Sequence, residues 1–473
     1  MKKNLTFPLG KDVPVMTRIF FLIGPMFFML AISFPSFAKN NLSPMILGEA
    51  GAIEDFGLIM MLSTLAASIF APVLQRIGDA IGRKKLALYT MIPYAATLVL
   101  IGFAKGTAAM AVGYALLGLC ASTTNSCSNG MVMDVFDPEV RTKYLSYMNA
   151  ANALASMFGP KLVGILSDNI GAQKAMMSLT ILLGIAWVII IAIQPNVKAA
   201  GELKIDGLGA LLLPFAIGPF CVVITCGGKQ IPWSSPIIWI LLIVSVVFAV
   251  IFYKAEVKVE KEGKLPMVTM SLLKDKRILM AGLFMAFMNV TSGIAQFLNL
   301  YCQSILNFNG SDLGTLQIFV FIPAVTVPFV GIWLAKTNKF KLCFIVSGLF
   351  SLLAGVSFYF FVAPGATPMG VAAAKIPMYL QNVLTLAPLN AYFAAILPAR
   401  ERGLGLAVIA FFGSVGQSIF TSAFSMILNM FQGNIAAAFP VMAIVTGALA
   451  ILRIIFVVIG IKDPEKETAA AQA

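Results

Sequence analysis

Long apolar stretches recur from one end of the chain to the other, and they limit the possible folds more than any other feature. Each is about 20 residues long, enough for a helix to cross a hydrocarbon core of about 30 Å. Apolar residues make up 59% of the 473 residues and charged residues only 11%, whereas a soluble domain carries roughly 25% charged residues. Because backbone groups in lipid must be hydrogen-bonded internally, the stretches predict transmembrane helices. A membrane β-barrel would instead show alternating segments of about ten residues.

The stretches predict an all-α polytopic membrane protein with about fourteen spans. With a cytoplasmic N-terminus, 26 of the 33 lysines and arginines fall in inside loops and four in outside loops, as the positive-inside rule requires. This bias favours an even number of spans, and twelve spans plus a re-entrant hairpin is the alternative. The first stretch shows no cleavage site, so it is expected to be retained as a span. The expected spans are residues 17–38, 56–77, 86–104, 107–133, 145–167, 173–194, 207–227, 236–253, 278–301, 313–335, 342–363, 369–396, 405–430 and 435–461.

The composition argues against several other classes of protein. The net charge of +13 does not indicate a nucleic-acid partner, because the basic residues lie in short loops on one side. The chain has no histidine, which removes the commonest general base and metal ligand. Its six cysteines form no metal-type pair and are interpreted as packing residues. We therefore predict neither an enzyme nor a cofactor or metal site.

A weak internal repeat relates the two parts of the chain. A turn-forming residue precedes a basic segment at Gly82, after the second span, and at Asn338, after the tenth. Arg141 after the fourth span is likewise matched by Arg402 after the twelfth. Two similar six-helix halves separated by two extra spans explain these matches. We predict an N-terminal six-helix bundle over residues 1–200, a linker with two additional helices over 201–264, and a C-terminal six-helix bundle with a short cytoplasmic tail over 265–473.

The loop after the second span is the sharpest local signal. Gly82 allows a tight turn, the bases that follow anchor the loop at the cytoplasmic face, and Asp79 can bind helix N-terminal amides or a cation. An ordinary positive-inside loop is the alternative, but it would not call for an aspartate three residues before a glycine. The loop resembles the Gly-x-x-x-Asp-Arg-x-Gly-Arg-Arg signature of major facilitator transporters. In that family the loop is a latch that favours one side-open state, a role that the resemblance implies for Asp79, Gly82, Arg83 and Lys84.

Two further segments resemble parts of the same family. The fifth span contains Gly159, Pro160 and Gly164, which predict a helix kink and the close approach of another helix. It resembles the Gly-Pro-x-x-Gly-Gly signature of the family's antiporters, and a generic kinked helix is the alternative. The two central spans resemble the linker pair of the fourteen-helix drug:proton antiporter branch. The resemblance therefore implies a major facilitator fold of two six-helix bundles plus two extra central helices.

The chain departs from that branch in its charged residues. The branch usually carries an aspartate in the first helix, where Met26 stands here, and an arginine and a glutamine before a glycine in the fourth, where Tyr114 and Leu117 precede Gly118. We find no acidic residue well inside any predicted span. Two usual parts of the proton-coupling machinery are therefore absent.

Three cations do fall within predicted spans, namely Lys161, Lys375 and Arg453. Such a charge costs at least about 2.5–3.5 kcal/mol and indicates function by default. Lys161 and Lys375 could bind an anionic substrate or reach the outer headgroups. Arg453 lies about two turns from the cytoplasmic end and could extend toward the interface.

Polar residues gather in particular spans, where they are expected to line a cavity or to hold helices together. For each one alone, helix–helix contact is the more common role. The candidate substrate-binding residues are Lys375, Lys161, Asn125, Asn149, Asn152, Asn289, Gln296, Gln381 and Asn382.

These observations predict a secondary active transporter of small organic solutes by alternating access, with efflux of amphipathic compounds coupled to an ion gradient as the leading hypothesis. Uptake or exchange of amphipathic carboxylates, using the intramembrane lysines, is the alternative. A non-transporting receptor or scaffold is a remote third. We expect a monomer in the plasma (inner) membrane, with both termini cytoplasmic. Its expected partners are the bilayer, a small-molecule substrate and protons.

Overall fold

The protein folds into helices joined by short connections, here in a computed structural model. The structure describes residues 8–10, 12–195, 197, 207–228, 230–262, 271–397 and 402–463. Within these ranges there is no β-strand, only two isolated backbone bridges. The chain divides into two compact units. Unit 1 comprises Met1–Asp55, Leu65–Ile205 and Asn309–Gln317, and unit 2 comprises Phe56–Thr64, Asp206–Phe308 and Ile318–Ala473.

Unit 1 is built around the long helix α1, which packs against α5, α6 and α8. Gly82 adopts a positive φ of 95° between α2 and α3, which lets one helix follow the other without an intervening loop. The helices assigned wholly or largely to this unit are α1 (Val15–Glu49), η1 (Ile53–Asp55), α2 (Phe56–Ile81), α3 (Arg83–Phe103), α4 (Gly106–Ala121), α5 (Thr124–Val135), α6 (Pro138–Ile170), α7 (Ala172–Ser178), α8 (Thr180–Ile193) and α13 (Gly310–Thr315).

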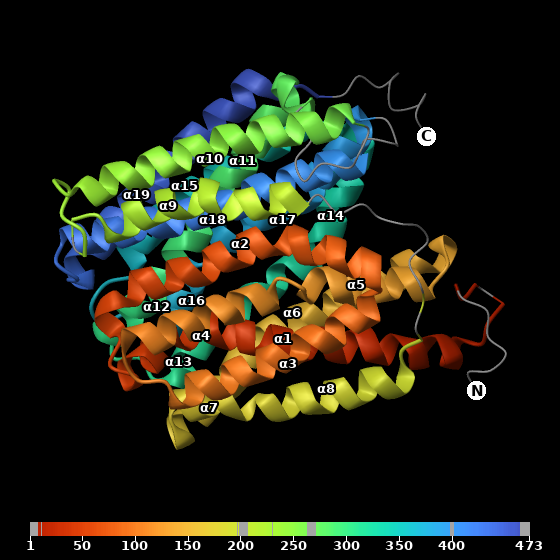
Figure 1. Cartoon of the computed structure of the whole chain (residues 1–473), viewed down its shortest axis with the longest axis horizontal. Helices are drawn as coiled ribbons and strands as arrows, with labels where there is room; N and C mark the ends of the chain where they lie inside the picture. Colours follow the sequence, from red (N-terminus) through yellow and green to blue (C-terminus); the bar gives the residue numbers. More distant parts are fainter. Residues whose placement is uncertain are drawn as a thin grey trace. The chain divides into compact units, whose positions relative to one another are not determined.

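Unit 2 contains the remaining helices, among which α9 and α10 run side by side (Figure 1). Helix α15 packs against both α17 and α19. The elements of this unit are α9 (Gly207–Cys226), α10 (Pro236–Lys261), η2 (Leu272–Lys274), α11 (Lys276–Met288), α12 (Val290–Ser304), η3 (Ile318–Phe321), α14 (Ile322–Thr337), α15 (Phe340–Phe361), α16 (Pro368–Ala374), α17 (Ile376–Ile396), α18 (Arg402–Met430) and α19 (Ile435–Gly460).

The helices confirm an all-α polytopic membrane protein. In the described part of the chain, ten helical segments are long and apolar enough to cross a bilayer, and α4 and Leu212–Cys226 of α9 are shorter apolar helices. The other two expected spans correspond to α6, which is long but more polar, and to α16 and α17 together. The count of fourteen spans stays a prediction.

The two units do not follow the predicted boundaries at 200 and 264. Helices α9 and α10 are grouped with unit 2, and two short segments pack in the unit formed by the other part of the sequence. One is Asn309–Gln317, which packs against α6, and the other is Phe56–Thr64. Glycines permit these contacts: a Cβ on Gly164 would lie 2.1 Å from the Gly310 carbonyl oxygen. The division into two bundles and a linker stays a prediction.

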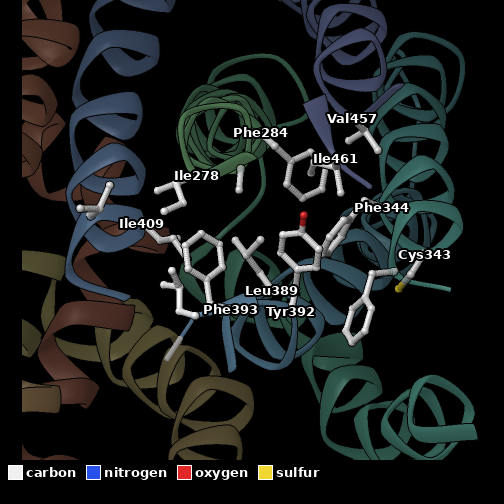
Figure 2. Close-up of a cluster of buried hydrophobic side chains, with 14 of the residues drawn as sticks. Ile278, Phe284, Cys343, Phe344, Leu389, Tyr392, Phe393, Ile409, Val457 and Ile461 are labelled. Carbon is white, nitrogen blue, oxygen red and sulfur yellow. The ribbon is translucent and has the colours of Figure 1, made fainter. Parts of the chain in front are cut away.

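The apolar core of unit 2 contains a group of aromatic side chains. Figure 2 shows Phe284 of α11, Phe344 of α15 and Tyr392 of α17 within this buried cluster. The ring centroids of Phe284 and Phe344 lie 5.0 Å apart, and those of Phe344 and Tyr392 lie 5.9 Å apart. Aromatic pairs in this range contribute about 0.5–1.5 kcal/mol beyond their buried area. The cluster therefore fixes α11, α15 and α17 beside the polar groups described next.

Candidate functional site

Arg453 of α19 is the largest charged group in the interior of unit 2. It is 0% exposed, and its guanidinium group donates to the Gln381 side-chain oxygen at 2.7 Å, the Ser347 hydroxyl at 2.9 Å and the Thr385 hydroxyl at 2.5 Å. The guanidinium carbon also lies 4.2 Å from the centroid of the Phe284 ring, within reach of a cation–π interaction. Arg453 is therefore held in the interior. It does not extend toward the cytoplasmic interface, the alternative that its position in the sequence allowed.

The arginine belongs to a hydrogen-bond network that joins several helices. The Gln381 amide nitrogen donates to the Thr291 hydroxyl of α12, and the Ser347 and Thr385 hydroxyls lie 2.7 Å apart. We call Arg453, Gln381, Ser347, Thr385 and Thr291 the Arg453 cluster. All five side chains are buried, and the three side chains that accept hydrogen bonds from the guanidinium group are neutral. The cluster thus holds a permanent positive charge with hydroxyl and amide dipoles.

Lys375 is the second buried cation of unit 2, and its surroundings are different. It lies between α16 and α17 and is 1% exposed. Its ammonium nitrogen lies 5.8 Å from the centroid of the Tyr379 ring, and Cys302 of α12 lies near it. Within the described ranges, no hydrogen bond from this ammonium group is found. The nearby backbone is already engaged, because the Ser357 hydroxyl donates to the Ala374 carbonyl at 2.7 Å.

Lys161 of α6, the third cation, is fully engaged within unit 1. Its ammonium group donates to the Ser311 carbonyl at 3.0 Å, the Ser311 hydroxyl at 2.7 Å and the Thr315 hydroxyl at 2.8 Å. About two helical turns further along α6, the Asp168 carboxylate accepts hydrogen bonds from the backbone N–H groups of Gly310 and Ser311 at 2.7 and 2.9 Å. These contacts between α6 and α13, together with the Gly164–Gly310 approach, form what we call the α6–α13 clamp.

Arg83, one of the predicted latch residues, forms an ion pair within unit 1. Arg83 donates to the Asp134 carboxylate at 2.6 Å, and each side chain is 26% exposed. Lys84 donates to the Gln194 carbonyl at 2.7 Å, so the loop residues bind the ends of α5 and α8. Asp79 lies on α2, but its side chain is outside the described residues.

The remaining polar candidates are dispersed. In unit 1, Asn152 accepts from the Ser33 hydroxyl of α1 at 3.2 Å, Asn149 is exposed, and the Asn125 side chain lies outside the described residues. In unit 2, the Asn289 amide donates to its own helix at the Met285 carbonyl, 3.2 Å away. The structure therefore brings Gln381 into the Arg453 cluster but does not gather the whole predicted set.

Two unit 2 candidates keep buried polar atoms without partners. No hydrogen-bond partner is found for the side-chain oxygens of Gln296 and Asn382 in the part of the chain that is described. Gln296 lies on α12, which also carries Cys302. Asn382 lies on α17, which begins directly after Lys375. Buried amide oxygens without partners are uncommon, so these two positions have unused acceptor capacity in unit 2.

Sequence reasoning missed several members of this interior. Ser347 and Thr385 bind Arg453, yet a single serine or threonine in an apolar span carries no distinguishing signal. Glu256 is fully buried, although the span was expected to end at residue 253. Helix α10 continues to Lys261 because Phe252 and Ala255 pack into the apolar core.

The helical units and their buried polar interiors define a polytopic α-helical membrane protein. The chain matches the model of the Major Facilitator Superfamily over residues 18–380. It belongs to this family.

Several relatives are named for drug transport or drug resistance. The chain is 22% identical over 400 residues to the multidrug transporter protein MdtP of Bacillus subtilis, covering 83% of this chain and 72% of the relative. It is 24% identical to the multidrug export protein EmrB of Haemophilus influenzae, over 83% of this chain and 79% of the relative. It is 23% identical to the multidrug resistance protein fnx1 of Schizosaccharomyces pombe, over 67% of this chain but only 60% of that protein's length.

Solved structures share the fold at low sequence identity. The structure of a peptide transporter POT in complex with sulfate matches with a TM-score of 0.66 and 14% identity, covering 92% of this chain and 93% of the other. An auto-inhibited POT family peptide transporter matches with a TM-score of 0.68 and 12% identity, over 94% and 98% of the two chains. These likenesses support the major facilitator fold alone.

Proposed function

We propose that the protein exports amphipathic organic compounds by alternating access. The family membership and the multidrug names of its relatives support this class of substrate. The observation that carries the proposal is the polar interior of unit 2, where cations and amides are buried among apolar helices. Polar groups at such positions are costly and mark solute pathways.

The proposed binding residues of unit 2 are those with unused hydrogen-bonding capacity, namely Gln296, Asn382 and Lys375. Asn289, at the junction of α11 and α12, is a further candidate. Gln381 contributes by keeping the Arg453 cluster in place, because both ends of its amide are engaged. In unit 1, Asn125, Asn149 and Asn152 stay candidates. Lys161 is the weakest candidate, since three hydrogen bonds already occupy its donors.

The latch proposal is supported by the ion pair between Arg83 and Asp134. This pair fixes the turn at Gly82 against the end of α5. We propose that Asp79, Gly82, Arg83 and Lys84 together bias the transporter toward one side-open state. The helix kink proposed at Gly159, Pro160 and Gly164 lies in the segment of α6 that contacts α13.

The cellular setting follows the distribution of basic residues. We propose a plasma (inner) membrane location, a cytoplasmic position for both termini, and a monomer that couples transport to an ion gradient. The 26-to-4 distribution of basic residues between the two sets of loops supports the orientation.

The proposal is tested with purified protein in proteoliposomes that carry an imposed pH gradient. Fluorescent amphipathic cations, anions and neutral compounds are each followed during efflux. We expect movement of at least one class that is faster than in protein-free liposomes and that depends on the gradient. Equal leakage with and without protein for all three classes would contradict the proposal.

A further inference from the structure

The three intramembrane cations of this chain differ in how their charges are satisfied. Lys161 donates three hydrogen bonds to α13, and Arg453 donates three to the Arg453 cluster. Lys375 is buried like Arg453, but within the described residues no hydrogen bond from its ammonium group is found, and the Tyr379 ring lies 5.8 Å away. A buried charge normally requires an anionic or hydrogen-bonding partner. Lys375 is therefore the one of these three cations for which the described residues supply no hydrogen-bond acceptor.

The groups around Lys375 do not supply that acceptor. In the described residues, the titratable groups near its ammonium group are Tyr379, in the first turn of α17, and Cys302, on α12. Both are buried. From α15, Ser357 approaches this junction, but its hydroxyl already binds the Ala374 carbonyl. An aromatic face attracts a cation by about 0.5–2 kcal/mol, less than the cost of burying the charge.

We propose that Lys375 binds the anionic group of the transported compound, so that the preferred substrates are amphipathic anions. The inference rests on the proposed transport function and names its substrate class. The ionised head group replaces the missing acceptor, while the Tyr379 ring and the apolar side chains nearby contact the tail. The same site disfavours amphipathic cations, because like charges repel.

The test is calorimetric titration of the whole protein in lipid nanodiscs with three probes of equal chain length. These are an alkyl sulfonate, which stays ionised, the neutral alkyl sulfonamide, and an alkyltrimethylammonium. The wild-type protein should bind the sulfonate more tightly than the sulfonamide by about tenfold or more, because a hydrogen bond to a charged group contributes about 1.5–3 kcal/mol.

The matched variants are Lys375→Met, Lys375→Arg and Lys254→Met. Lys375→Met should lose the preference for the sulfonate while binding the ammonium probe no more weakly. Lys375→Arg should keep the preference, because arginine stays charged, and this variant tests the site if methionine prevents folding. Lys254→Met, at an exposed lysine of α10, should keep the preference.

An unchanged preference in Lys375→Met would overturn the assignment, as would an equal loss of affinity for all three probes. Failure of the transport proposal is distinguishable. A protein that discriminates between the probes in nanodiscs but moves none of them in proteoliposomes retains the site and loses the function.

Discussion

Substitution of Arg453 by lysine is expected to destabilise the protein more than substitution by methionine. Lysine keeps the positive charge but lacks the planar fork that reaches Gln381, Ser347 and Thr385 together. An ammonium group is also more strongly hydrated than a guanidinium group, so its burial costs more. Methionine preserves apolar contact over the Phe284 ring and brings no charge into the bundle.

The magnitudes follow from the contacts of the Arg453 cluster. Neutral hydrogen bonds between membrane helices contribute about 0.6 kcal/mol each and charge-assisted ones about twice that, so the three bonds of Arg453 contribute roughly 3–4 kcal/mol. Burying the cation costs at least about 2.5–3.5 kcal/mol, which nearly offsets them. Arg453→Met should therefore cost about 1–3 kcal/mol, chiefly through the unpaired Gln381 oxygen. Arg453→Lys should cost about 3–5 kcal/mol, as expected for a buried charge deprived of partners.

The assay is thermal unfolding in lipid nanodiscs, followed by the fluorescence of the four tryptophans. The expected order of Tm is wild type, then Arg453→Met, then Arg453→Lys. The double variant Arg453→Met/Gln381→Met should be more stable than Arg453→Met alone, because it removes the unpaired oxygen. Lys254→Met, at an exposed lysine of α10, is the matched control and should leave Tm unchanged. The reasoning is refuted if Arg453→Lys is as stable as the wild type while Arg453→Met unfolds.

Three other predictions follow from the contacts of unit 1 and the start of α11. Arg83→Ala and Asp134→Ala should each slow transport, because each breaks the ion pair of 2.6 Å. The charge swap Arg83→Asp/Asp134→Arg should recover part of the transport rate. A swap variant slower than both single variants would argue against the pair. Gly164→Ala should lower Tm markedly, since its Cβ would lie 2.1 Å from the Gly310 oxygen, whereas Gly184→Ala, which has nothing within 4 Å, should not; equal Tm values would show that α6 and α13 do not pack this closely. The hydrogen bond from Arg277 holds the pKa of Asp275 below its usual 3.8, so the carboxylate's contribution to stability is present above that value and is lost as the pH falls through the lowered pKa. Asp275→Asn should abolish this acid-side loss yet keep the cap of α11, while Asp275→Ala should cost about 0.5–2 kcal/mol; both are measured by Tm against pH.

The amino-acid sequence determines the membrane class of this protein because lipid imposes a local requirement. Every spanning segment must be apolar and must satisfy its own backbone, so each helix is visible in about 20 consecutive residues. Gly82 shows the same principle at a turn, where the residue's own backbone freedom permits the φ of 95°. The family resemblance of the loop that begins at Asp79 likewise depends on neighbouring residues only.

Only the tertiary structure decides which intramembrane polar groups are already satisfied. Lys161 and Lys375 are equivalent in the sequence as isolated lysines in apolar segments. Lys161 finds its partners 150 residues away in Ser311, and Arg453 finds Gln381 72 residues away, whereas Lys375 lies beside an aromatic ring. Hydrogen bonds across such separations depend on how helices pack, and packing of similar apolar surfaces leaves no periodic signal in one chain. The sequence thus locates the charges, and the packing determines which of them remains available for a substrate.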